Sequence, residues 1–164
     1  MNNQDYKGVD DTVSNIILLI KKHSDDNALE FFDDKPLGDI FDFIAKDVRY
    51  LADPMDVKFL SGGNIELLRS PVQTMYQLAG DCDDKTILAG SLFHRAGLPL
   101  RIAVSSNRKD KKFHHVYPEV KLRNKWKTFD ATYDDNKIFE EKPWTRKRLY
   151  YPVGSKLIKQ EFVR

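Results

Sequence analysis

The chain has 164 residues, the length of one ordinary domain and enough to bury a core without disulfides or metals. Hydrophobic residues make up 41% and charged residues 32% of it, a composition that excludes the disordered and fibrous classes. The net charge of +2 hides a basic stretch over 107–128. Its basic residues alternate with others, as on the solvent face of a hairpin, so we expect no nucleic-acid partner.

The N-terminus shows no basic segment followed by an apolar one, so we expect no signal peptide. The longest apolar run, 16–20, is far shorter than the roughly 20 residues of a membrane span. These features predict a cytoplasmic protein with no transmembrane segment and no membrane partner. Cys82 is the single cysteine, so its chemistry is that of a free thiol.

The first third of the chain is predicted to be helical. Apolar residues at helical spacing favour a helix over 12–23, with Asp10 or Asp11 at its start. Asp34 and Pro36 suit the cap and an early position of a second helix. The apolar stripe of this second helix is Ile40, Phe41, Ile44 and Val48.

Glycines and prolines over 52–71 predict a loop with short extended pieces, followed by a short helix over 72–79. The next helix, 82–96, is the best signalled. Asp81 can cap it, and Gly97 can provide the left-handed stop.

Strands are predicted over 98–104, 113–122 and 126–129, with Arg123-Asn124 as a tight turn. The mixed basic and aromatic segment 144–151 is interpreted as an edge strand with a solvated face and no function of its own. Together these elements predict an α+β fold, with helices packed on an antiparallel sheet.

Cys82 is predicted to lie at the start of a helix, where unpaired N–H groups and the helix dipole favour a thiolate. A cysteine nucleophile also needs an imidazole nearby. His23 and His94 are poorly placed for this role, whereas His114 and His115 lie on a predicted strand and face opposite ways. Spacing alone leaves open which of these two faces the thiol.

Four blocks of the sequence resemble, in order, the core of the transglutaminase-like superfamily. They are Gly80-Asp-Cys-Asp-Asp84, Ala96-Gly-Leu-Pro-Leu-Arg101, His115-Val-Tyr-Pro-Glu-Val120 and Trp126-Lys-Thr-Phe-Asp-Ala-Thr132. The resemblance implies a papain/transglutaminase-like core within a single domain, 1–164, with 1–52 as helical scaffold and 70–133 as catalytic core.

Carried over by position, the resemblance implies that Cys82 is the nucleophile, His115 its base and Asp130 the carboxylate that orients the base. His115 is preferred to His114 because Tyr117 and Glu119 follow it at the spacing of the family. The family often has Trp where this chain has Tyr117.

An oxyanion hole is expected from the backbone N–H of Cys82, with a side-chain amide of Gln77 or Gln73 as the second donor. The acids around the thiol resemble those of bacterial transglutaminase-like cysteine proteinases, in which such acids take part in calcium binding. No cofactor is required, but Asp81 and Asp83 are thereby candidate calcium ligands.

The resemblance implies acyl transfer on a protein or peptide substrate, and we expect hydrolysis, by a peptidase or deamidase, rather than transamidation. Hydrolysis is favoured because a chain of this size has no further domains to build a protein-sized acceptor surface. One rival is an assembly or structural component, since the chain is also similar to small transglutaminase-like proteins of tailed phages; it would then be virion-associated, with phage structural proteins as partners. A metal site using Cys82 and a histidine is a weaker rival.

Overall fold

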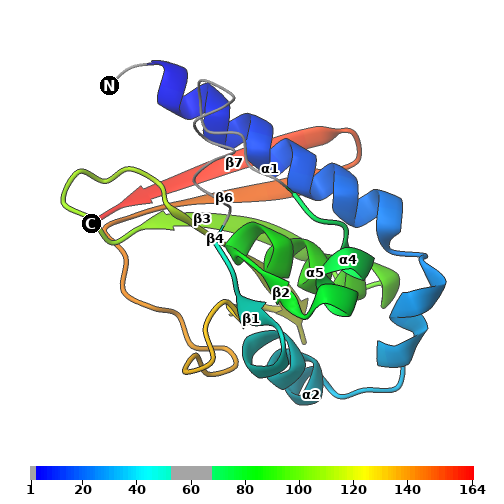
Figure 1. Ribbon diagram of the computed structural model, residues 1–164. Helices are drawn as coiled ribbons and strands as arrows, with labels where there is room; N and C mark the ends of the chain where they lie inside the picture. The colour runs from blue at the N-terminus through cyan, green and yellow to red at the C-terminus, as the bar shows by residue number, and fades with distance from the viewer. Residues whose placement is uncertain (1–2, 53–67) are drawn as a thin grey trace, which may run out of the picture.

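The computed structural model describes residues 3–52 and 68–164, with side chains from residue 8 onward. Helices cover one face of a twisted antiparallel sheet (Figure 1). The helical elements are α1 Asn3–His23, a 3₁₀ segment Asn27–Phe32, α2 Leu37–Asp42, a π-helical turn Phe43–Asp47, α4 Pro71–Gln77 and α5 Cys82–Arg95. The predicted α+β fold is confirmed.

The main sheet has the strand order β5-β4-β3-β6-β7, and every neighbouring pair is antiparallel. Its strands are β3 Leu100–Ser106, β4 His115–Leu122, β5 Lys125–Thr128, β6 Arg146–Val153 and β7 Lys156–Val163. A separate two-stranded parallel pair joins β1 Arg49–Tyr50 to β2 Ala79–Gly80, directly before α5.

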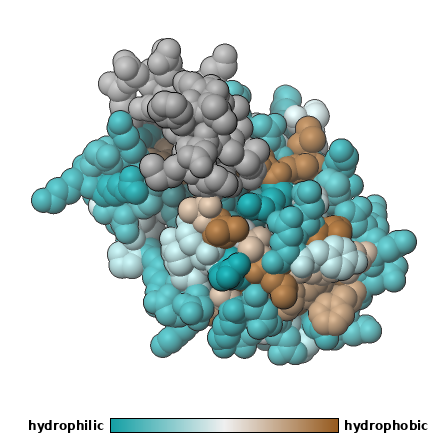
Figure 2. Space-filling view, viewed as in Figure 1, coloured by the Kyte–Doolittle hydropathy of each residue, from teal (hydrophilic) through white to brown (hydrophobic). Residues whose placement is uncertain are grey.

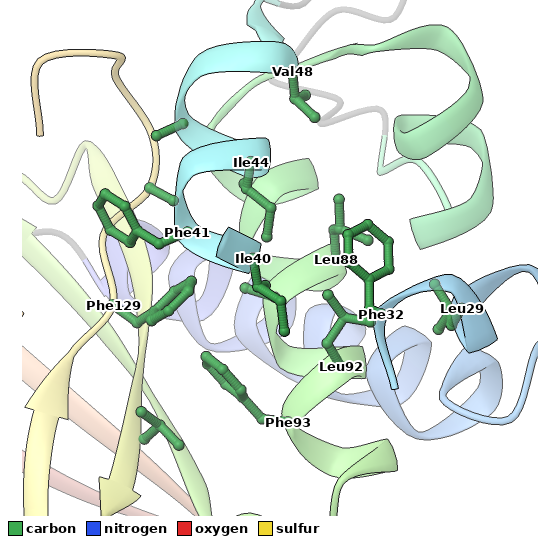
Figure 3. Packing of buried hydrophobic residues seen from close by; sticks show 14 residues of the cluster. Leu29, Phe32, Ile40, Phe41, Ile44, Val48, Leu88, Leu92, Phe93 and Phe129 are labelled. Carbon is green, nitrogen blue, oxygen red and sulfur yellow. The ribbon is translucent and has the colours of Figure 1, made fainter. Parts of the chain in front are cut away.

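The core lies between the helices and the sheet and forms two main clusters. In one, Phe41 and Phe93 pack edge-on against Phe129, which follows β5 (Figure 3). In the other, the apolar stripe of α1 packs against Ile87 of α5 and against the sheet. Helix α5 contributes to both clusters, so it is held on two sides.

Helix α1 is longer than the sequence suggested. The predicted start at Asp10 or Asp11 is wrong, since the helix begins at Asn3 and the residues before Asp10 include no proline to stop it. Asp10 instead accepts hydrogen bonds from Tyr150 at 2.6 Å and Lys159 at 2.7 Å.

The second helix has its N-cap at Pro36, which makes no side-chain cap, so Asp34 does not cap it as predicted. Its expected apolar stripe is buried, as the helical period required. The predicted loop over 52–71 lies mostly outside the described residues. Helix α4 matches the predicted 72–79 segment with a shift of one to two residues.

The prediction of an edge strand over 144–151 is wrong. Strand β6 lies between β3 and β7, and its residues Arg146, Lys147 and Arg148 are buried. They are tolerated there because acids from other elements pair with them: Glu161 with both arginines, and Glu119 and Glu141 with the lysine.

Figure 2 shows one face of the molecule, on which hydrophilic residues dominate and hydrophobic ones gather in small areas. Among the described residues, no helix is both long enough and apolar enough to cross a membrane.

Candidate functional site

Cys82 is the first residue of α5 and is partly exposed. One carboxylate oxygen of Asp81 accepts the backbone N–H of Asp83 at 3.0 Å and that of Asp84 at 3.1 Å. In return, the Asp84 carboxylate accepts the N–H of Asp81 at 3.2 Å, which completes a capping box. The predicted cap is confirmed, and it fixes the thiol at the positive end of the helix dipole.

Asp84 is fully buried beneath the capping turn. The backbone N–H of Arg69 donates to it at 2.8 Å, and the Arg69 guanidinium pairs with its other oxygen. A Cβ on Gly80 would lie 2.7 Å from the Cβ of Asp84, so only glycine fits before the cap. The glycine and the last acid of the Gly-Asp-Cys-Asp-Asp motif therefore have a structural role.

His115 opens β4, and its Nε2 lies 2.7 Å from Oδ2 of Asp130, which follows β5. The other oxygen of Asp130 accepts the hydroxyl of Thr132 at 2.7 Å. The side-chain amide of Asn136 donates to the backbone carbonyl of Asp130 at 2.9 Å. His115 and Thr132 thus hold the carboxylate of Asp130, and Asn136 holds its backbone. Because Nε2 of His115 faces the carboxylate, Nδ1 is the ring nitrogen available for chemistry.

Asp130 is buried, which by itself raises its pKa, but the hydrogen bond and charge of His115 and the two hydrogen bonds from Thr132 lower it more. The net pKa lies below the usual value, so the carboxylate is ionised at neutral pH. An ionised Asp130 can hold the ring in one orientation and stabilise an imidazolium.

Helix α5 and strand β4 are joined next to these residues. The hydroxyl of Thr86 lies 2.7 Å from the carbonyl oxygen of Cys82 and 3.2 Å from that of Val116. Thr86 is one helical turn from the thiol, and Val116 adjoins His115. The start of the helix and the start of the strand therefore meet at one end of the helix–sheet interface.

Two tyrosines that the sequence reasoning missed lie beside this site. Tyr50 is in register with Gly80 across the β1–β2 pair, and its ring centroid is 5.1 Å from that of Tyr133. The ring of Tyr133 stacks on His115 at 6.4 Å with an interplanar angle of 20°. Burial and the neighbouring Cys82 and Tyr133 raise the pKa of Tyr50, so its phenol stays protonated.

The four histidines have different surroundings. His114 is exposed, and its Nδ1 lies 3.2 Å from the carbonyl oxygen of Lys112. Its neighbour His115 is the histidine that contacts Asp130. His23 ends α1 and pairs with Asp26, and His94 is exposed near the end of α5.

The two glutamines proposed for the oxyanion hole lie on the exposed side of α4. The side-chain oxygen of Gln73 accepts the backbone N–H of Ser70 at 3.0 Å, so this residue completes a second capping box. Gln77 is the last residue of the helix. An oxyanion role for either residue stays a prediction.

The proposed calcium ligands do not form a cation cage in the described part of the chain. Asp81 uses one oxygen to cap α5, and Oδ1 of Asp83 lies 4.0 Å from the sulfur of Cys82. Over residues 8–52 and 68–164, no three acids, histidines or cysteines are grouped so as to hold a metal ion. Calcium binding by Asp81 and Asp83 stays a prediction.

A cavity of about 550 Å³ lies at the other end of α5, lined by Phe32, Leu92 and Phe93 among others. On its rim, Arg95 forms a two-point ion pair with Asp33. No thiol or imidazole is among the described residues that line this cavity. The candidate site is therefore placed at the start of α5, where Cys82 lies.

Comparison with known proteins agrees with this fold. No curated protein matches the chain. Among solved structures, a protein of Cytophaga hutchinsonii proposed to be a cysteine protease matches at 21% identity and a TM-score of 0.50, over 72% of this chain and 42% of that one. A protein called a TGase matches at 17% identity and a TM-score of 0.46, over 87% of this chain and 36% of that one. The chain thus spans less than half the length of either structure.

The family model described as "Transglutaminase-like superfamily" matches residues 30–131, which include the start of α5, all of β4 and the segment after β5. That range is more than half of the chain. The order of thiol, imidazole and carboxylate along it agrees with the four sequence blocks. The chain belongs to the transglutaminase-like superfamily.

Proposed function

We propose that the chain is a cysteine-dependent acyl-transfer enzyme that acts on peptide or glutamine amide bonds, with water as the favoured acceptor. The observation that carries the proposal is the 2.7 Å contact between His115 and the buried Asp130, at the end of the interface where α5 presents Cys82. A partly exposed histidine with only a structural role would not need a buried, ionised carboxylate behind it.

In the proposed mechanism, Nδ1 of His115 takes the proton of the Cys82 thiol, and the resulting ion pair is stabilised by Asp130 and by the helix dipole. The thiolate attacks the carbonyl carbon of the amide, and the negative charge moves to the carbonyl oxygen. The backbone N–H of Cys82 is the natural first donor to that oxygen.

The imidazolium then donates its proton to the departing nitrogen, so the amide C–N bond breaks and a thioester remains on Cys82. Water attacks the thioester while His115 accepts a proton. Collapse of this second intermediate returns the proton to the sulfur and releases a carboxylic acid. Because Cys82 is partly exposed, water can reach the thioester, which supports hydrolysis.

The first test needs no known substrate. Cys82 is the only cysteine, so the rate of alkylation by iodoacetamide reports on this one thiol. We expect the folded protein to react at pH 6, where an ordinary thiol of pKa about 8.5 is almost fully protonated. The same chain unfolded in urea is the matched control. Equal pH profiles in the folded and unfolded chains would contradict the enzyme and favour an assembly or structural role.

The second test uses a glutamine-containing peptide, with released ammonia and the mass of the acylated protein as readouts. Cys82→Ala should form neither product while keeping the circular dichroism of the wild type. Ammonia release by folded Cys82→Ala would contradict the mechanism.

A further inference from the structure

Lys85 lies on α5 three residues after Cys82, and its side chain is almost completely buried. Its ammonium donates to the carbonyl oxygen of Thr132 at 2.7 Å. A buried ammonium is costly, and an apolar residue would fill the same place at lower cost. Packing alone therefore does not account for a lysine at position 85.

Hydrogen bonds connect Lys85 to His115, the proposed base, through Thr132 and Asp130. Thr132, whose carbonyl it binds, donates its hydroxyl and its backbone N–H to Oδ1 of Asp130, and Oδ2 of Asp130 binds His115. A single connected path thus runs from the helix that carries the thiol, through the segment after β5, to the imidazole.

The charges around Lys85 come mainly from that segment. Burial lowers the pKa of its ammonium to about 8, while Asp130 and Asp134 raise it. His115 lies beyond Asp130, and Cys82 lies one turn back on the same helix. The ammonium therefore stays charged at neutral pH, with the ionised Asp130 close to it.

We propose that Lys85 is a positioning residue that fixes the Asp130 segment to the helix of the thiol and, through its charge, sets the pH range in which Cys82 is reactive. The proposal rests on the proposed function, because it concerns the same thiol and imidazole. A positive charge at Lys85 favours the thiolate of Cys82 over the neutral thiol and competes with the imidazolium of His115 for Asp130. A lysine that serves only packing would have neither effect.

The experiment is the pH profile of Cys82 alkylation in three variants of Lys85. Lys85→Met removes the donor and the charge, Lys85→Gln removes the charge but can still donate, and Lys85→Arg keeps the charge. We expect both neutral variants to shift the profile to higher pH by about half a unit or more, and Lys85→Arg to keep its position. Lys125→Met, at an exposed residue of β5, is the matched control.

If Lys85→Met does not fold, Lys85→Gln decides the question. A folded neutral variant whose profile superposes on that of the wild type would overturn the proposal. This outcome differs from the one that would contradict the proposed enzyme function, in which the pH profile of the wild type itself matches that of the unfolded chain. Lys85→Arg with a profile shifted as far as that of Lys85→Gln would also overturn it, since charge would then not be the cause.

Discussion

A carboxylate as deeply buried as Asp130 is retained only where its partners stabilise its charge. Here His115 and Thr132 do so, and they hold its pKa below the usual value despite burial. Its folded-state pKa is depressed, so its contribution to stability is present at neutral pH and is lost as the pH falls through the folded pKa.

Asp130→Asn should leave a folded protein whose Cys82 alkylation at pH 6 falls strongly. An amide cannot stabilise the imidazolium, so acylation should slow by roughly 10²–10⁴-fold. Because the residues act as a unit, adding Asp130→Asn to Cys82→Ala should remove no further activity. Alkylation and peptide hydrolysis across the four proteins would measure this. Unchanged alkylation at pH 6 in Asp130→Asn would contradict the role of the carboxylate.

Lys85 also predicts a dependence of stability on pH. The folded-state pKa of Lys85 is about 8, below the usual 10.5, so the unfolded chain binds the proton more tightly than the folded one. The charged ammonium therefore disfavours folding at pH values below about 8. Between about pH 8 and 10 the free energy of unfolding of the wild type should therefore rise relative to that of Lys85→Met, by up to about 3 kcal/mol. Urea titrations of both proteins would show it. A constant difference over this range would contradict the depressed pKa.

Sequence reasoning supplied Cys82, His115 and Asp130 as candidates because each stands in a block that resembles the family. It did not supply Lys85, because lysine is mostly exposed and no periodic pattern marks one as buried. It also missed Tyr50, which reaches the site only through the pairing of two-residue strands, a long-range contact that local patterns do not encode.

At the scale of elements, the crossing of α1 and α5 depends on Gly90. Its missing side chain gives room to Ile20 of α1, and a methyl built on Gly90 would overlap the end of that side chain. Ile20 is fully buried, so it has little space to move away.

Gly90→Ala should destabilise the protein, because overpacking costs about 1–3 kcal/mol whereas the gain in helix propensity is about 1 kcal/mol. Ile20→Val removes the terminal methyl and should make Gly90→Ala less costly. Urea unfolding of the two single variants and the double variant would give the coupling energy. Strictly additive effects would show that the two residues do not compete for space.

The elements also show where pattern reading fails. The predicted helix over 82–96 was nearly correct because cap, period and stop signal agree locally. The segment of β6 was misread because consecutive basic residues look solvent-facing, and their acid partners lie elsewhere in the chain. The turn at Arg123 and Asn124 was predicted correctly because asparagine favours the left-handed conformation, which both residues adopt in the structure.

For the whole molecule, Asp10 is the residue through which α1 is fixed to the β6–β7 hairpin. It accepts hydrogen bonds from Tyr150 and Lys159 and also pairs with Arg148. Burial by itself raises the pKa of Asp10. Hydrogen bonds from Lys159 and Tyr150 and the charges of Lys159 and Arg148 lower it by more, so the net pKa lies below the usual value.

Asp10→Asn should lower the free energy of unfolding at pH 7 by about 1–2 kcal/mol, since it removes a charge that three donors share. The pKa is depressed in the folded state, so the difference from the wild type should shrink as the pH falls through that pKa. Thermal unfolding at pH 7 and at low pH would check both expectations. The neighbouring Asp11→Asn, at an exposed residue of the same helix, is the control. Equal melting temperatures for the two variants at pH 7 would contradict the role of Asp10.

The contact between α1 and Tyr150 has a consequence for synthesis on the ribosome. The apolar stripe of α1 emerges before Tyr150, which completes its cluster and is made more than a hundred residues later. At about 5–20 residues per second, that stripe waits roughly 7–30 s for its cover. A nascent chain of this protein should therefore need a chaperone most in the interval before the β6–β7 hairpin appears.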